Sequence, residues 1–255
     1  MRPSLWTLAA IPLLVVLGLY IYTNQGMLPG VLSPAPAKDT QGTLTCTLTA
    51  GKCVHVEETP HYVISATYPN LSGERRRAVE AALLVQINRF KDDLAVMLTS
   101  EEKMRLEETG RMYELSIDYK PFEGAGYTSY EFDIYLDTGG AHPNGFYKTL
   151  VFDAQGREVW LEDLFKPGAR YLEVLSQESY KQVLSELERR SGAPATPDME
   201  ETVRLGTAPS PEALQFFVID GDELVLLFPP YQVAAYALGS FEARIPLANL
   251  KDVLK

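Results

Sequence analysis

The sequence is poor in the side chains that build metal centres and activated nucleophiles. Only three histidines and two cysteines occur among 255 residues. The motifs His-Glu-x-x-His and Gly-x-Ser-x-Gly, a P-loop and a Rossmann glycine fingerprint are all absent from it. A zinc peptidase, a serine hydrolase and a nucleotide-binding enzyme are therefore disfavoured. We predict no cofactor, no metal site and no catalytic residue.

Basic residues are also in deficit. The chain holds 23 Lys and Arg against 34 Asp and Glu, which gives a formal net charge of −11 and a sequence pI of about 4.8. Such a surface repels nucleic acid and anionic lipid headgroups, so we expect no nucleic-acid partner. The acidic residues are spread along the chain, which indicates ordinary solvated faces; a surface for a basic partner is the alternative.

Charge is missing altogether from the mainly apolar segment Leu5–Tyr22. Roughly 18 such residues can cross a bilayer as a helix, and Trp6 and Tyr20 near its two ends suit the two interfaces. Residues 1–23 are therefore predicted to be a transmembrane anchor. Arg2 keeps the N-terminus in the cytoplasm, so we expect a single-pass protein of the cell membrane whose C-terminal domain is extracytoplasmic.

A cleavable signal peptide is the competing interpretation of the same segment. The small-residue pattern Ala35-Pro36-Ala37 suits cleavage, but it follows the apolar run at too great a distance. Residues 24–42 are rich in Pro, Gly, Ser and Thr, which is typical of a flexible stalk. Under both interpretations the folded part of the chain is exported.

The two cysteines, Cys46 and Cys53, fit an exported domain because nearby thiols pair in an oxidising compartment. Residues 43–57 alternate roughly in polarity and bend near Gly51, which predicts a small hairpin with a disulfide across it. A metal site is the alternative, with His55 and His61 as the nearest further ligands. The cysteine spacing does not match that of a zinc ribbon.

Hydrophobic periodicity predicts an α+β fold. Amphipathic helices are expected at residues 72–98 and 169–190. Alternation and turn signals predict strands at 61–68, 111–120, 127–137, 146–153, 215–220, 223–228 and 241–246, a hairpin loop at 121–126, helical turns at 161–165 and 247–254, and a linker at 191–198. The predicted fold is an N-terminal membrane helix, then two antiparallel sheets, each packed with one long helix.

The segment 137–147 concentrates unusual residues between two of the predicted strands. Gly139 and Gly140 reach backbone angles that other residues avoid, and Asn144-Gly145 is a strong turn signal. The corner is either a structural turn or the rim of a site. The ligand-binding residues that we predict there are His142, Asn144, Tyr147, Gly139 and Gly140.

His142 has three interpretations. It holds the corner by bonding the local backbone, it contacts a ligand or partner, or it pairs with Asp133 or Asp137 as a general base. No nucleophile accompanies the third arrangement. The many tyrosines in and beside the predicted strands have two interpretations: ordinary sheet packing, or an aromatic surface for glycans or protein partners.

The order of these pieces resembles a known family arrangement. The N-terminal half carries a strand ending in Tyr68-Pro69, a long helix, two alternating strands and then Gly139-Gly140-Ala141-His142-Pro143-Asn144. The C-terminal half carries Asp153-x-x-Gly156, Leu161-x-Asp163-Leu164-Phe165 and Phe228-Pro-Pro-Tyr231-Gln232-Val233-Ala234-x-Tyr236-Ala237-x-Gly239. Together they resemble a PdaC-type domain (DUF4163), here residues 43–140, followed by an RsiV-like domain of unknown function (DUF3298), here residues 141–255.

The resemblance implies a bacterial envelope protein with its domains outside the membrane. In some relatives such domains accompany a polysaccharide deacetylase, and in others they form the lysozyme-sensing part of an anti-sigma factor. We expect neither a deacetylase domain after residue 252 nor a sigma-binding segment before the anchor. The predicted function is non-enzymatic binding or sensing of a cell-wall glycan such as peptidoglycan, or of a protein such as lysozyme. The alternative is a cell-wall carbohydrate-modifying enzyme that uses the His142 corner.

Overall fold

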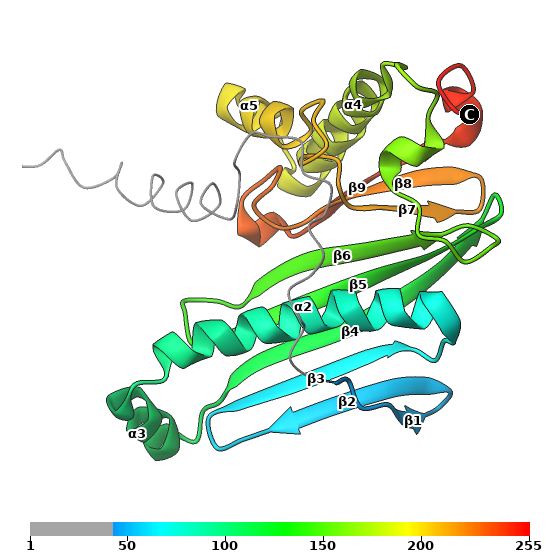
Figure 1. The fold of residues 1–255 in the computed structure, drawn as a ribbon. Helices are drawn as coiled ribbons and strands as arrows, with labels where there is room; N and C mark the ends of the chain where they lie inside the picture. Colours follow the sequence, from blue (N-terminus) through cyan, green and yellow to red (C-terminus); the bar gives the residue numbers. More distant parts are fainter. Residues whose placement is uncertain (1–42) are drawn as a thin grey trace, which may run out of the picture. The chain divides into compact units, whose positions relative to one another are not determined.

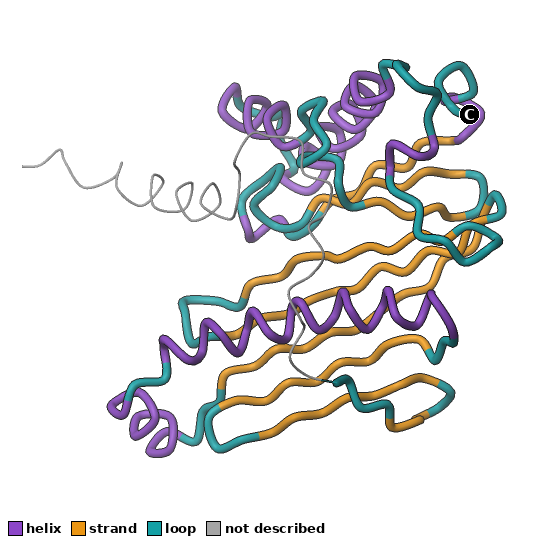
Figure 2. The backbone as a smooth tube through the Cα atoms, viewed as in Figure 1, coloured by secondary structure: helices purple, strands orange, loops and turns teal. Residues whose placement is uncertain are grey.

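The computed structural model describes residues 43–255, which form two β-sheets and four α-helices (Figures 1 and 2). The mixed α+β prediction is confirmed for this part of the chain. The predicted anchor at 1–23 and stalk at 24–42 lie outside the described residues. Within those residues, none of the helices has the length and apolar character that a membrane crossing needs.

The first sheet has six strands in the order of the chain. They are β1 (Thr47–Thr49), β2 (Lys52–Glu58), β3 (Tyr62–Pro69), β4 (Tyr113–Gly124), β5 (Tyr127–Asp137) and β6 (Asn144–Phe152). Neighbouring strands are antiparallel except β3 and β4, which are parallel. The prediction of a purely antiparallel sheet is wrong at this pair. Two helices connect β3 to β4 and carry the chain back to the end where β3 began, which is how parallel neighbours are joined.

Those two helices are α2 (Gly73–Met97) and α3 (Ser100–Thr109). Helix α2 lies along one face of the first sheet (Figure 1). It buries one stripe of side chains at helical spacing: Val79, Leu83, Ile87, Phe90 and Leu94. Thr99 separates the two helices and caps the start of α3, because its hydroxyl accepts a hydrogen bond from the Glu102 amide at 3.2 Å. Gly110 ends α3 in the left-handed conformation.

The second sheet has three antiparallel strands: β7 (Phe217–Asp220), β8 (Glu223–Phe228) and β9 (Phe241–Pro246). Helix α4 (Tyr171–Ser191) packs against β9, and α5 (Pro197–Gly206) packs beside α4. Three short 3-10 turns complete this part of the chain: η1 (Leu161–Leu164), η2 (Tyr236–Leu238) and η3 (Leu247–Leu250). One long helix per sheet is therefore confirmed.

Two local predictions need correction. The predicted linker contains the start of α5, where Thr196 accepts from the Met199 amide and Pro197 occupies the first turn. The predicted loop 121–126 is mostly strand, and β4 runs on through Pro121. Strand β3 pairs with β4 only as far as Ile117, so Pro121 lies beside a free edge where a missing N–H is tolerated.

Strand β7 docks its outer edge on the face of the first sheet that α2 leaves free. The Ile219 amide donates to the Ser129 hydroxyl at 3.0 Å, and the Phe217 amide donates to the Thr149 hydroxyl at 3.2 Å. The edge of the second sheet is thus satisfied by side chains rather than by another strand. Strand β6 follows the predicted domain boundary at 140/141 and completes the first sheet; the division into 43–140 and 141–255 stays a prediction.

The N-terminal hairpin forms as its sequence suggests. Ala50 and Gly51 both have positive φ angles, which is the geometry of a tight two-residue hairpin turn. The structure joins Cys46 to Cys53 by a disulfide, with their Cα atoms 4.7 Å apart. His55 and His61 turn elsewhere: His55 accepts from Thr45, and His61 contacts Glu107.

Reducing this disulfide is expected to lower the free energy of unfolding by about 2 kcal/mol, because the bridge closes a short loop and so restricts the unfolded chain only modestly. The measurement is the thermal midpoint of the chain with and without a reductant. A Cys46→Ser/Cys53→Ser variant serves as the control and should not respond to the reductant. Equal midpoints for the parent chain would contradict the bridge.

Candidate functional site

The corner between β5 and β6 is held by its own backbone and by side chains from both halves of the chain. The Asp137 carboxylate accepts from the Gly139 amide at 2.8 Å. Gly139 has φ +75°, and the place of a Cβ there would be 3.2 Å from the Tyr113 ring. Glycine is therefore required at position 139 by the turn geometry and by the close approach of Tyr113 on β4, and not by any contact with His142.

His142 makes two hydrogen bonds. Its Nδ1 lies 2.9 Å from the carbonyl oxygen of Pro143, and its Nε2 lies 2.8 Å from the hydroxyl of Tyr231. A carbonyl oxygen can only accept, so Nδ1 carries the proton, and in the neutral imidazole Nε2 accepts from the tyrosine. Because both nitrogens are engaged, His142 does not form the dyad with Asp133 or Asp137 that the sequence allowed.

An aromatic cluster surrounds this histidine. Its ring stacks on Tyr236 with centroids 4.0 Å apart and planes 16° from parallel. Tyr231 lies against both rings, at 5.9 Å from His142 and 5.4 Å from Tyr236. We call His142, Tyr231 and Tyr236 the His142 cluster. It brings the β5–β6 corner together with the segment between β8 and β9, which is far away in the sequence.

Tyr231 is held in a strained backbone conformation. Its φ is +73°, in a region that bulky residues rarely occupy. The next residue fixes it there, because the Gln232 side chain donates to the carbonyl oxygens of Gly206 and Ala213, both at 2.8 Å. Gly206 touches the Gln232 backbone so closely that a Cβ would overlap it. Strain of this kind, imposed by anchored neighbours, is typical of functional positions.

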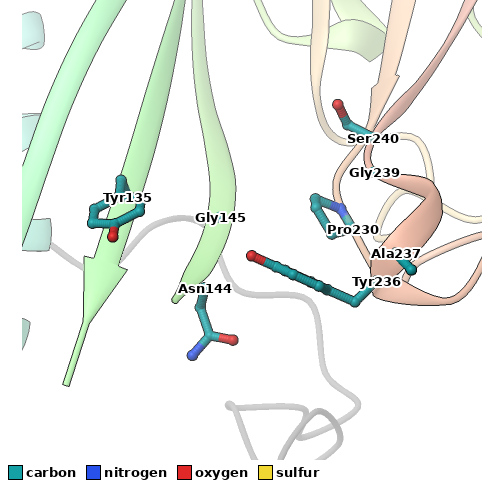
Figure 3. A pocket seen from close by; sticks show the side chains of 8 residues that line it. All are labelled: Tyr135, Asn144, Gly145, Pro230, Tyr236, Ala237, Gly239 and Ser240. Carbon is teal, nitrogen blue, oxygen red and sulfur yellow. The ribbon is translucent and has the colours of Figure 1, made fainter. Parts of the chain in front are cut away.

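A cavity of about 380 Å³ opens beside the cluster. One wall comes from the first sheet and the other from the segment before β9 (Figure 3). Figure 3 shows the Tyr236 ring extending from its loop toward Gly145, with Tyr135 beyond it. The lining residues are Tyr135, Asn144, Gly145, Pro230, Tyr236, Ala237, Gly239 and Ser240, and none of them is charged.

Arg190 of α4 positions the second wall. Its Nη1 donates to the carbonyl oxygens of Leu238 at 2.8 Å and Ser240 at 2.6 Å, and its guanidinium lies 4.1 Å from the centroid of the Phe241 ring. These bonds hold the turn that follows Tyr236. The long helix of the second sheet thereby fixes one side of the cavity.

The predicted site residues are only partly brought together. Asn144 lines the cavity and His142 lies in the cluster beside it, with Gly140 next to His142. Tyr147 is not a lining residue of the cavity; it is on the same face of β6 as Gly145 but farther along the strand, and its ring packs on Phe216 with the ring centroids 6.4 Å apart. Burial raises the pKa of its hydroxyl, and a hydrogen bond with Ser240 partly offsets this.

Three tyrosines of the site were not singled out from the sequence. All three were grouped with the other tyrosines in or beside strands, for which sheet packing and an aromatic binding surface were the two interpretations. One signal was present: Tyr231 directly follows Pro229-Pro230, outside any strand pattern. Nothing local shows that this segment returns to His142. Among the described residues no cluster of three or more acidic, histidine or cysteine side chains suits a metal ion.

The second half of this fold matches a recognised family. Residues 162–248 match the family described as "Protein of unknown function (DUF3298)", so this part of the chain is a DUF3298 domain. Two solved structures of DUF3298 family proteins have the same fold. One is from Bacteroides fragilis (TM-score 0.53, 18% identity, 83% of this chain and 95% of that chain), and the other is from Pseudomonas aeruginosa (TM-score 0.53, 15% identity, 85% and 96%).

Two curated proteins are similar in sequence. The peptidoglycan-N-acetylmuramic acid deacetylase PdaC of Bacillus subtilis is 35% identical over 151 residues, which are 58% of this chain and 31% of that protein. The esterase Rv3036c of Mycobacterium tuberculosis is 28% identical over 114 residues, which are 44% of this chain and 46% of that protein. The chain thus spans less than half the length of each of these relatives.

Proposed function

We propose that this chain is a cell-envelope protein that binds a cell-wall glycan in the cavity beside the His142 cluster. Residues 1–23 would anchor it, and residues 43–255 would lie outside the cytoplasm. In this proposal residues 43–140 correspond to a PdaC-type domain that precedes the DUF3298 domain. The name of the Bacillus relative supports peptidoglycan as the source of the glycan.

The observation that carries the proposal is the chemistry of the cavity wall. Its two tyrosines offer flat apolar faces, and Asn144 and Ser240 offer neutral hydrogen-bonding groups. A sugar ring presents the matching combination of apolar C–H faces and hydroxyl groups. No charged side chain lines the cavity, so a neutral ligand can enter without removing a charged group of the protein from water. A strongly anionic ligand would find no positive charge there.

Co-sedimentation with insoluble peptidoglycan tests the proposal directly. The purified full-length chain should pellet with peptidoglycan, and soluble N-acetylglucosamine oligomers should release it. Lysozyme immobilised on beads is tested in parallel, because a net charge of −11 also suits a basic protein. A chain that stays in the supernatant with peptidoglycan would rule out the glycan proposal.

An enzyme is the second candidate, and the Tyr231–His142 hydrogen bond favours it. The Tyr231 hydroxyl donates to Nε2 of His142, and the Pro143 carbonyl oxygen holds Nδ1 of the same ring. Such a pair can transfer a proton. The two curated relatives are named as a deacetylase and an esterase. Peptidoglycan fragments and a short-chain ester are incubated with the chain and with His142→Ala. Turnover that disappears in the variant supports this candidate; unchanged substrate in both removes it.

Because the backbone of Tyr231 is strained, we predict that replacing this residue changes glycan affinity much more than the stability of the fold. Replacing Tyr231 with Gly relieves the left-handed strain and offsets the lost side-chain contacts, so the free energy of unfolding should change by less than about 1 kcal/mol. Glycan affinity should fall about tenfold, because the ring that packs on the lining residue Tyr236 and the hydroxyl that bonds His142 are both lost. Ala50→Gly is the matched control: it relieves a similar φ of +49° far from the cavity and should leave affinity unchanged. Equal affinity of the two variants would argue against a binding role for Tyr231.

A further inference from the structure

The face of the first sheet opposite α2 carries a straight row of side chains that leads to the cavity. Cross-strand pairing aligns Val56 with Ser65, Ser65 with Ser116, Ser116 with Tyr135, and Tyr135 with Gly145. Residues in register on adjacent strands project from the same face about 4.8 Å apart. The row therefore crosses five strands, and its last two members are cavity-lining residues.

The row stays open to solvent where the second sheet does not reach. Val56 is 56% exposed and Tyr135 is 40% exposed, and the two serines between them are partly exposed. Strand β7 covers this face at Ser129 and Thr149, farther along β5 and β6. The uncovered part is thus a strip with small hydroxyl side chains in the middle and an aromatic ring at the cavity end.

Two like-charge pairs flank the strip. Glu114 is directly opposite Asp137 on one side of Ser116 and Tyr135, and Asp118 is directly opposite Asp133 on the other side. Like charges at directly opposed positions destabilise a sheet. Partial desolvation and the nearby carboxylates of Asp137 and Glu114 raise the pKa of the Tyr135 hydroxyl.

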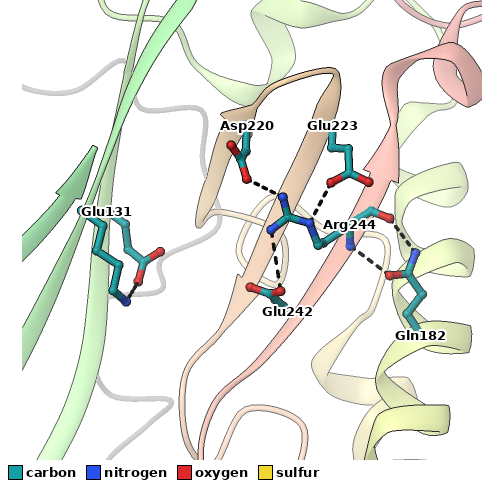
Figure 4. A network of polar contacts seen from close by, with 7 residues as sticks. Glu131, Gln182, Asp220, Glu223, Glu242 and Arg244 are labelled. Atoms are coloured by element: carbon teal, nitrogen blue, oxygen red, sulfur yellow. Dashed lines mark hydrogen bonds and ion pairs between the residues drawn. The ribbon is translucent and has the colours of Figure 1, made fainter. Parts of the chain in front are cut away.

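Among the described residues, basic side chains neutralise only one of these four carboxylates, Asp133. Lys120 already pairs with Glu131 at 2.9 Å and with Asp133 at 3.0 Å. Arg244 is surrounded by Asp220, Glu223 and Glu242 in the second sheet (Figure 4). Within residues 43–255 neither Glu114 nor Asp118 forms an ion pair. The sheet thus keeps a cost in stability that a cationic ligand would remove.

We propose that this strip, which we call the acidic face, binds a glycan chain that carries free amino groups, as de-N-acetylated amino sugars do. The inference rests on the proposed glycan site and extends it along the sheet. The ammonium groups of the sugars would lie beside the carboxylates of Glu114, Asp137 and Asp118, because Lys120 already pairs with Asp133. The sugar rings would follow the serines toward Tyr135 and enter the cavity there. A basic protein also matches the charge, but the narrow row of small side chains that ends in a sugar-sized cavity fits a glycan chain better.

Two soluble probes separate this inference from the proposed function: the tetramer of N-acetylglucosamine and the tetramer of glucosamine. Calorimetric titration of the full-length chain should show tighter binding of the glucosamine tetramer. That preference should decline with added salt, because its source is electrostatic. Binding of neither tetramer defeats the proposed function and this inference together. Equal affinity for the two tetramers defeats the inference alone.

Substitutions that remove carboxylates from the acidic face test whether the glycan binds there. Glu114→Gln/Asp118→Asn should reduce affinity for the glucosamine tetramer about fivefold and leave that for the N-acetylglucosamine tetramer unchanged. The same variant should have a higher thermal midpoint, since the repulsion between Glu114 and Asp137 is relieved. Asp93→Asn/Glu108→Gln is the matched control, because it removes the same net charge from exposed positions on α2 and α3.

Three results would overturn the inference at this step. The first is a preference for the glucosamine tetramer that persists in the Glu114→Gln/Asp118→Asn variant. The second is an equal loss of that preference in the Asp93→Asn/Glu108→Gln control, which would indicate net charge alone. The third is capture of lysozyme that depends on Glu114 and Asp118 while the glucosamine tetramer binds no better than its acetylated form. That last result would assign the acidic face to a basic protein.

Discussion

Replacing Tyr236 with alanine is expected to lower glycan affinity about 30-fold, the size of effect seen when a central aromatic contact is truncated. Tyr236 contributes to the site in two ways. Its ring forms part of the cavity wall, and it stacks on His142 at 4.0 Å, which holds the β5–β6 corner beside the segment before β9. Its loss removes a binding surface and loosens the junction that shapes the cavity.

The measurement is titration of the full-length chain with the N-acetylglucosamine tetramer. Tyr236→Phe is the matched variant, because it keeps the ring and its stacking and removes only the hydroxyl. We expect Tyr236→Phe to bind within about threefold of the parent chain. The thermal midpoint of each variant shows whether the fold is intact. A Tyr236→Ala variant that folds and binds like the parent chain would place the glycan elsewhere.

Replacing Gly124 with alanine is expected to lower the free energy of unfolding by about 3 kcal/mol. Gly124 ends β4 where the Gly221 backbone of the second sheet crosses it, and a Cβ at Gly124 would overlap that backbone. The Gly221 amide also donates to the Glu123 carbonyl oxygen at 3.0 Å. Backbone is on both sides of this contact, so no side chain can rotate away to make room.

Gly145→Ala is the control for this prediction. Gly145 also lies in a strand of the first sheet, but no atom lies within 4 Å of the place where its Cβ would be. Alanine there should leave the free energy of unfolding unchanged or slightly higher, because glycine is a poor strand residue. Denaturant titration of both variants gives the comparison. Equal stabilities would mean that the two sheets separate at Gly124 with little cost.

Local sequence patterns predicted a helix, strand or turn correctly wherever its neighbouring residues alone decide its conformation. The stripe from Val79 to Leu94 predicted α2, because a helix over a sheet buries one face at a spacing of three and four residues. The alternation in Tyr127–Asp137 predicted β5 with its observed ends. The hairpin at Gly51 followed from a turn that few residues can make.

The sequence predictions were wrong mainly where contacts between distant parts of the chain decide the structure. The parallel pairing of β3 with β4 depends on where α2 and α3 return the chain, and no residue in either strand encodes that direction. Pro121 was interpreted as a loop residue because the sequence does not show that β3 ends early beside it. The start of α5 was hidden in a Pro- and Ala-rich stretch, although Thr196-Pro197 is a recognisable helix beginning.

For the site, sequence alone determined the corner and the presence of His142 in it, because glycine and proline have local conformational preferences that do not depend on the rest of the chain. The turn predicted at Asn144-Gly145 was wrong, since both residues lie in β6 and pair with β5. Only the tertiary structure decided what His142 meets. Docking of β7 on the first sheet places the segment before β9 opposite the corner, so that Tyr231 and Tyr236 pack on His142 and a cavity forms. That contact joins residues 89 positions apart, and it depends on how two sheets pack rather than on any local preference.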